Sequence, residues 1–104
     1  MMKKELLQIM GHFGLKKQLR KLQEEIDELK EAIIVYDLKE SVEYEIPLTE
    51  IIGCKEHIAE EFMDVMILMK QICYYLELNK CDLKKIEKEK IERTLKRIED
   101  GYYE

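Results

Sequence analysis

Four acidic side chains occur as two pairs at helical spacing. Glu25 and Glu28 lie three residues apart in the stretch QEEIDEL, and Glu61 and Asp64 lie three apart in EEFMD. In a helix this spacing places both carboxylates of a pair on the same side. Four carboxylates facing one point repel each other unless they are protonated or bind a hard divalent cation, and Mg²⁺ prefers carboxylate oxygens. The two pairs therefore predict an Mg²⁺ site, with Mn²⁺ as the alternative ion.

Asp64 is the least expected of these acids, because the residues around it from Phe62 to Met69 are otherwise apolar. Ionised carboxylates are seldom fully buried without a partner. The setting of Asp64 therefore favours the metal interpretation. The alternative is that both pairs belong to solvated, Glu-rich helix faces, which are common on protein surfaces.

Two long amphipathic helices are expected to position these acids. Apolar residues recur at alternating steps of four and three over residues 15–33 and again over residues 58–76, which is the period of a helix packed along one face. The pattern predicts helices over about 15–38 and 54–78. Antiparallel packing of the two helices would bring both acidic pairs to the same level, beside the apolar seam.

The rest of the chain predicts an all-α fold. With one Pro and four Gly in 104 residues, we expect a single domain, 1–104, folded as a bundle of about three to four helices. The second long helix is apolar on most sides, so homo-oligomerisation, as a dimer or a tetramer, is expected to complete the bundle. The other predicted elements are a short helix over 3–10 ended by Gly11 and Gly14, a linker over 39–53 with a helical turn after Pro47, and a helix over 83–100 capped by Asp82 and stopped by Gly101.

Composition and charge exclude several classes of function. A net charge of −5 disfavours nucleic-acid binding as the main task. The longest apolar run is too short to span a membrane, no N-terminal signal is visible, and three cysteines without paired spacing favour reduced thiols, so we expect a cytoplasmic protein. Residues 23–64 hold 14 acidic and 3 basic residues. This acidic middle between basic ends indicates a cation site facing a phosphate-binding rim.

The order EEIDE and then EEFMD resembles the EExxE…ExxD signature of the MazG-like, all-α NTP pyrophosphohydrolases. The ending KIERTLKRIEDGYYE resembles the basic C-terminal segment of small, phage-type members of that family. The resemblance implies hydrolysis of nucleoside triphosphates to monophosphate and pyrophosphate, in the service of nucleotide-pool housecleaning. It also implies Mg²⁺ ligands at Glu25, Glu28, Glu61 and Asp64. Glu24 and Glu60, the first acids of the two doublets, are the weaker candidates, for orienting a water or supporting the ligands.

Basic residues near the C-terminus are the expected contacts for the triphosphate. Lys90, Arg93 and Arg97 recur at helical spacing and could present one cationic face. Lys21, close to the first acidic pair, could join them, and Tyr102 could stack on a base. The alternative is that these charges form surface ion pairs that merely support a helix.

Two features depart from the family pattern. The connection from Glu28 to Glu61 is long, so residues 39–53 are expected to be an insertion near the substrate, and the C-terminal segment lacks the asparagine of many members. A different class also fits the heptads, namely a non-catalytic helical oligomerisation and interaction module, but it leaves the ordered acidic pairs unexplained. Within the enzymes, a dUTP- or dCTP-selective hydrolase shares this metal architecture.

Overall fold

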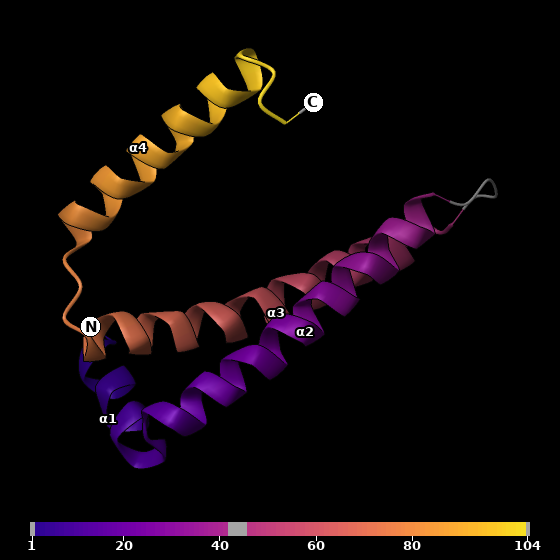
Figure 1. Ribbon diagram of the computed structural model, residues 1–104. Helices are drawn as coiled ribbons and strands as arrows, with labels where there is room; N and C mark the ends of the chain where they lie inside the picture. Colours follow the sequence, from indigo (N-terminus) through magenta and orange to yellow (C-terminus); the bar gives the residue numbers. More distant parts are fainter. Residues whose placement is uncertain (1, 42–45, 104) are drawn as a thin grey trace.

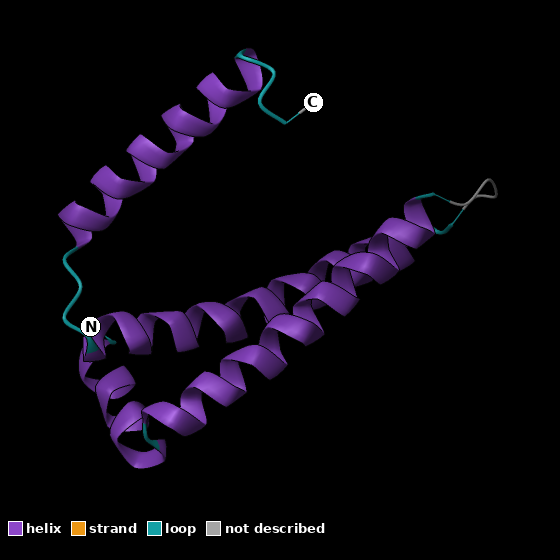
Figure 2. Ribbon diagram, viewed as in Figure 1, coloured by secondary structure: helices purple, strands orange, loops and turns teal. Residues whose placement is uncertain are grey.

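The computed structural model describes residues 2–41 and 46–103, which form four helices (Figure 1). Only helices and loops occur in that part of the chain (Figure 2), so the all-α prediction is confirmed. No helix among the described residues is long and apolar enough to cross a membrane. Residues 42–45 of the predicted linker lie outside the described residues. The helices are α1 (Lys3–Phe13), α2 (Leu15–Glu40), α3 (Leu48–Tyr75) and α4 (Lys80–Glu99).

The helices α2 and α3 lie antiparallel along one another, and α1 packs across the end where α2 begins and α3 ends (Figure 1). Few of the described apolar side chains are buried between them. These are Leu6 and Met10 of α1, Ala32 of α2, and Val65 and Leu68 of α3. Burial of apolar surface is the main stabilising term in folding, so this single chain has a small core for its length.

The break between α1 and α2 is at Gly14, whose φ of +85° is a left-handed conformation that glycine adopts without strain. The expectation that Gly11 ends the first helix is wrong. Gly11 lies inside α1, directly after the buried Met10. A glycine inside a helix costs only about 1 kcal/mol relative to alanine, and the packing of Met10 outweighs that cost.

The helix α3 begins directly after Pro47, so residues 48–53 of the predicted linker are helical. The sequence predicted one turn here and a new helix from about Cys54, but the helix continues through Gly53 without a break. The Lys39 Nζ atom lies 2.8 Å from Glu50 Oε1. This ion pair ties the last turn of α2 to the first turn of α3 and supports the early start.

The helix α4 has well-defined ends and, in the part of the chain that the structure describes, no partner helix. Asn79 is its cap, because the Asn79 side chain accepts hydrogen bonds from the Cys81 and Asp82 backbone N–H groups; the prediction that Asp82 is the cap is wrong. Gly101, at φ +72°, ends the helix as predicted. Among the described residues, α4 makes no contact with the other three helices, and it stands apart from them in Figure 1.

Two of the three most buried positions of α2 carry polar side chains. The three positions are Gln18, Glu25 and Ala32, spaced by seven residues. Leu19 and Ile33, which belong to the predicted apolar stripe, are about half exposed. The helix is therefore rotated relative to the prediction, and Glu25 lies within the seam rather than beside it.

Candidate metal centre

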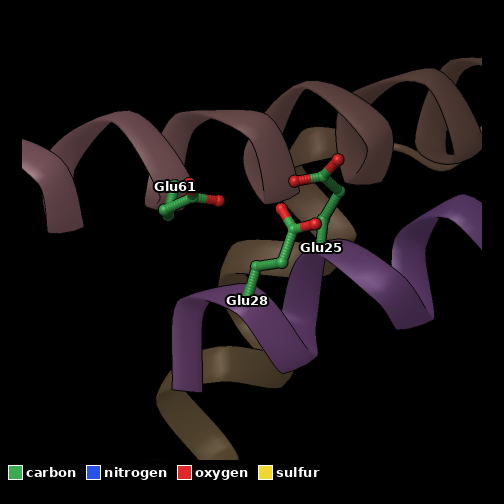
Figure 3. A group of neighbouring side chains, drawn as sticks. All are labelled: Glu25, Glu28 and Glu61. Carbon is green, nitrogen blue, oxygen red and sulfur yellow. The ribbon is translucent and has the colours of Figure 1, made fainter. Parts of the chain in front are cut away.

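Three glutamates from two helices meet between α2 and α3. One carboxylate oxygen each from Glu25, Glu28 and Glu61 lies within 4.8 Å of the others (Figure 3). Glu25 and Glu28 lie one turn apart on α2, and Glu61 comes from the facing turn of α3. Two oxygens on opposite sides of Mg²⁺ are about 4.2 Å apart, because each Mg–O bond is about 2.1 Å. Small side-chain rotations would thus bring all three oxygens, called here the glutamate triad, onto one ion.

Two members of the triad carry buried oxygens that nothing satisfies. The side chain of Glu25 is 8% exposed and that of Glu61 is 16% exposed. Within the described part of the chain, Glu25 Oε2 and Glu61 Oε2 are buried and have no hydrogen-bond partner. A buried polar atom without a partner is costly, and a buried charge more so. Hard oxygen donors with this deficit fit a hard divalent cation.

Lys21 compensates one oxygen of the triad. Its Nζ atom lies 2.9 Å from Glu25 Oε1, and the hydrogen bond and charge of Glu25 raise the pKa of Lys21 above its usual value. Lys21 itself is half exposed, so its charge is partly screened by water. The His57 Nε2 atom lies 3.8 Å from Glu61 Oε1. Among the described residues, Glu28 is therefore the member of the triad that forms no ion pair.

The carboxylates perturb each other as expected for like charges. A hydrogen bond with Glu25, together with the charge of Glu25, raises the pKa of Glu28 above its ordinary value, and the nearby Glu61 adds to this effect. Glu28 therefore keeps its proton to a higher pH than an isolated glutamate does. A cation bound between the three carboxylates would offset their repulsion and so lower the pKa of Glu28.

Asp64, the fourth predicted ligand, lies outside the glutamate triad. It is exposed, although its sequence neighbours are apolar, and it lines a cavity beside the triad together with Glu25 and Lys21. Residues three apart in a helix point about 60° away from each other, so Asp64 points to one side when Glu61 faces α2. Its ligand role stays a prediction. Glu24 is exposed and lies 4.0 Å from Lys21, and its role also stays a prediction.

The C-terminal residues predicted to bind substrate lie on α4 or just after it. Lys90, Arg93 and Arg97 are on the helix, and Tyr102 follows it. The Arg97 guanidinium lies over the Tyr102 ring, 5.0 Å from its centroid. Since α4 does not touch the other helices among the described residues, the single chain does not bring these side chains to the triad. Their contact with substrate stays a prediction.

Sequence reasoning missed a buried amide pair close to the triad. The Gln18 Nε2 atom donates a hydrogen bond of 2.8 Å to Gln71 Oε1, and both side chains are almost fully buried. A signal for Gln18 was present, because it precedes Glu25 by seven residues and so shares its helix face. The same spacing marks Gln71, which follows Asp64 by seven residues and so shares its helix face.

A scan against protein-family models, a search of curated proteins and a search of solved structures all return no match for the chain. The function is therefore inferred from the residues themselves. The relevant features are the order of the two acidic motifs and the meeting of Glu25, Glu28 and Glu61 between two helices.

Proposed function

We propose that this chain is an Mg²⁺-dependent nucleoside triphosphate pyrophosphohydrolase, similar to the MazG-like enzymes. The observation that carries the proposal is the glutamate triad, in which two buried carboxylate oxygens have no partner. The triad also comes from the two motifs whose order resembles that family. Desolvating unpaired carboxylates costs stability, so a chain that served only as a scaffold would gain nothing from them.

In this proposal Glu25, Glu28 and Glu61 would hold the ion. Bound Mg²⁺ supplies neutralisation of phosphate charge and a more acidic coordinated water. Lys21, held at the triad by Glu25, is placed to bind a phosphate oxygen. Asp64, at the adjoining cavity, takes the proton of the attacking water, and Glu24 is the alternative acceptor. The water oxygen bonds to the α-phosphorus, the bond to the bridging oxygen breaks, and pyrophosphate leaves with the monophosphate remaining.

We also propose that the functional unit is a homo-oligomer. The chain exposes 8916 Å² of surface, whereas a compact monomer of its mass would expose about 6,200 Å². The excess is larger than the roughly 800 Å² that each partner buries in a stable interface. The radius of gyration of 18.0 Å likewise exceeds the roughly 13 Å of a compact domain of about 100 residues.

The helix α4 is the part of the chain that most needs a partner. None of its residues is buried, and Ile91, Leu95 and Ile98 are more than half exposed. Residues 80–99 carry eight basic and five acidic side chains, and this charge complements the acidic middle of the chain. Packing of α4 onto a second copy would bring Lys90, Arg93, Arg97 and Tyr102 to the triad of that copy. These residues could then bind substrate although they lie away from the triad of their own chain.

The exposed apolar face of α4 also supports the second candidate function, a helical interaction module. A non-catalytic oligomerisation module would need such a face and would need no metal. The two candidates differ in what they expect of Glu25. In the enzyme it binds an ion, whereas in the module it is a buried charge compensated only by Lys21.

The test is a calorimetric titration of Mg²⁺ into metal-free protein, with pyrophosphate release measured on a panel of ribo- and deoxyribonucleoside triphosphates. Wild type and Glu24→Gln are compared with Glu25→Gln, since Glu24 is the exposed neighbour and its replacement removes the same charge. We expect Glu25→Gln to lose Mg²⁺ binding and pyrophosphate release, while Glu24→Gln keeps Mg²⁺ binding. Absence of both signals in wild type would favour the interaction module. Release from dUTP or dCTP alone would favour the selective hydrolase.

A further inference from the structure

A cavity of about 390 Å³ opens beside the glutamate triad, where α1, α2 and α3 meet. Its walls are mostly apolar, and Glu25 belongs to both the cavity and the triad. This volume is within the range of small-molecule sites, which combine apolar walls with a few fixed polar groups. We propose that this cavity binds the base of a nucleotide, with Phe13 as the stacking surface and Gln18 and Gln71 as the groups that bond the base edge. The inference rests on the proposed function, because it places the phosphates at the triad.

The amide pair is a buried polar feature of this pocket, which Lys17, Lys21, Glu25 and Asp64 also line. Gln18 and Gln71 are 5% and 2% exposed, and each lines the cavity. Their mutual hydrogen bond uses Gln18 Nε2 and Gln71 Oε1. The other two polar atoms, Gln18 Oε1 and Gln71 Nε2, are not among the fully buried unpaired atoms of the described residues. In the proposed site these two atoms face the cavity that both residues line, one as an acceptor and the other as a donor.

The two remaining polar atoms, one acceptor on Gln18 and one donor on Gln71, determine which bases the site can bind. Every standard base carries a donor and an acceptor side by side on its pairing edge, so each can match the free atoms of Gln18 and Gln71. Rotation of both amides exchanges donor and acceptor without breaking the bond between them. We therefore expect the site to bind ligands that carry a base more tightly than ligands without one, and to discriminate only weakly among the bases.

Phe13 supplies the surface on which a base can stack. It is the last residue of α1, its side chain is 45% exposed, and it lines the cavity. The Lys17 Nζ atom lies 5.4 Å from the centroid of the Phe13 ring, so a cation stands next to that surface. Stacking of a base on an aromatic side chain is independent of base identity and is lost with truncation to alanine.

The distance along α2 suits a nucleotide. Gln18 and Glu25 are two helical turns apart, about 10 Å along the axis. Lys17 and Lys21 line the same cavity between those levels. A nucleotide lying along α2 would therefore place its base at Gln18 and its phosphates between Lys21 and the triad. The charges suit this orientation, because Lys17 and Lys21 lie where the negatively charged phosphate chain would pass.

Two phenylalanines make a matched experiment, because the chain has only Phe13 and Phe62. Phe62 is 50% exposed on α3 and does not line the cavity. The probes are an α,β-methylene nucleoside triphosphate, which cannot release pyrophosphate, and inorganic tripolyphosphate, which has no base. Both are titrated calorimetrically with Mg²⁺ into wild type, Phe13→Ala and Phe62→Ala, and circular dichroism melts check that each variant is folded.

We expect wild type and Phe62→Ala to bind the nucleotide analogue at least tenfold more tightly than tripolyphosphate. In Phe13→Ala the analogue should lose roughly tenfold in affinity while tripolyphosphate is unaffected. Equal binding of the two probes by wild type would overturn the base site and leave the metal site standing. So would equal losses in the two phenylalanine variants.

A second measurement separates this inference from the proposed function. If no probe binds with Mg²⁺, the pyrophosphohydrolase proposal fails, but the cavity can still be examined with a nucleoside alone. Adenosine at millimolar concentration should then shift the NMR signals of the Gln18 and Gln71 side-chain amides and of the Phe13 ring, without metal. Unchanged signals at these three side chains would overturn the base site itself.

Discussion

Replacement of Glu61 by glutamine should stabilise the metal-free protein. Oxygens of Glu25 and Glu61 lie within 4.8 Å of each other, and two unit charges at that distance repel by about 3 kcal/mol at an effective dielectric constant of about 20, or about 1 kcal/mol in water. Glutamine keeps the shape of the side chain and removes one charge. We therefore expect a gain of about 1–3 kcal/mol in the free energy of unfolding, with each kcal/mol raising the melting temperature by about 4–8 °C.

Mg²⁺ should reverse that order of stability. An ion that binds only the folded state adds about 2.7 kcal/mol at a hundred times its dissociation constant. Wild type should gain this increment and Glu61→Gln should not. Thermal melts in EDTA and in excess Mg²⁺, at fixed protein concentration, measure both effects. Glu60→Gln is the control, because it removes the same charge from the adjacent, exposed position and should respond to Mg²⁺ like wild type. If Glu61→Gln is less stable in EDTA and Mg²⁺ leaves wild type unchanged, the triad is not a cation site.

Three further predictions concern the amide pair, the shared proton and the fourth helix. Gln71→Met should lower the free energy of unfolding in urea by about 1–3 kcal/mol, because it leaves Gln18 buried without its partner, and the double change of both residues to methionine should recover most of the loss. The pKa of Glu28 is raised by Glu25, so its proton stabilises the metal-free fold at low pH. That contribution to stability should be lost as pH rises through the raised pKa of Glu28. Thermal melts in EDTA between about pH 4 and 7 should show this loss of stability, and Glu28→Gln should make stability less dependent on pH over the same range. Light scattering should find wild type as a dimer or tetramer and Leu95→Glu, which places a charge on the apolar face of α4, as a smaller species, while Lys96→Glu on the charged face should assemble normally.

The fold class and the number of helices followed from the sequence, because hydrophobic periodicity is a local property. Helix boundaries were less predictable where a weak local signal competed with packing. Gly11 and Gly53 both resemble stops, yet both lie inside helices. The local cost of about 1 kcal/mol for each glycine is smaller than the gain from packing α1 and α3 against their neighbours. Gly14 ends α1 because its positive φ turns the chain into α2.

The candidate site was predictable as a set of acids on two facing helices but not as a geometry. The spacing fixes which residues share a helix face only to within the 60° between positions three apart. A rotation of that size separates Glu61, which faces α2, from Asp64, which lines the cavity. The rotation depends on how two whole helices pack, so a single motif carries no information about it.

The arrangement of polar and apolar residues on α2 is informative about what the chain is for. Stability alone would favour leucine and isoleucine in the seam and polar residues outside. Instead Gln18 and Glu25 are buried, while Leu19 and Ile33 are half exposed. The buried amide gains a hydrogen bond, but Glu25 Oε2 gains none. This pattern is explained if, as proposed, the seam binds an ion and a ligand and the apolar stripe packs against another subunit. The proposed metal site and the proposed oligomer would thus both follow from one rotation of α2. A chain found to be monomeric would leave the exposure of Leu19 and Ile33 without that explanation.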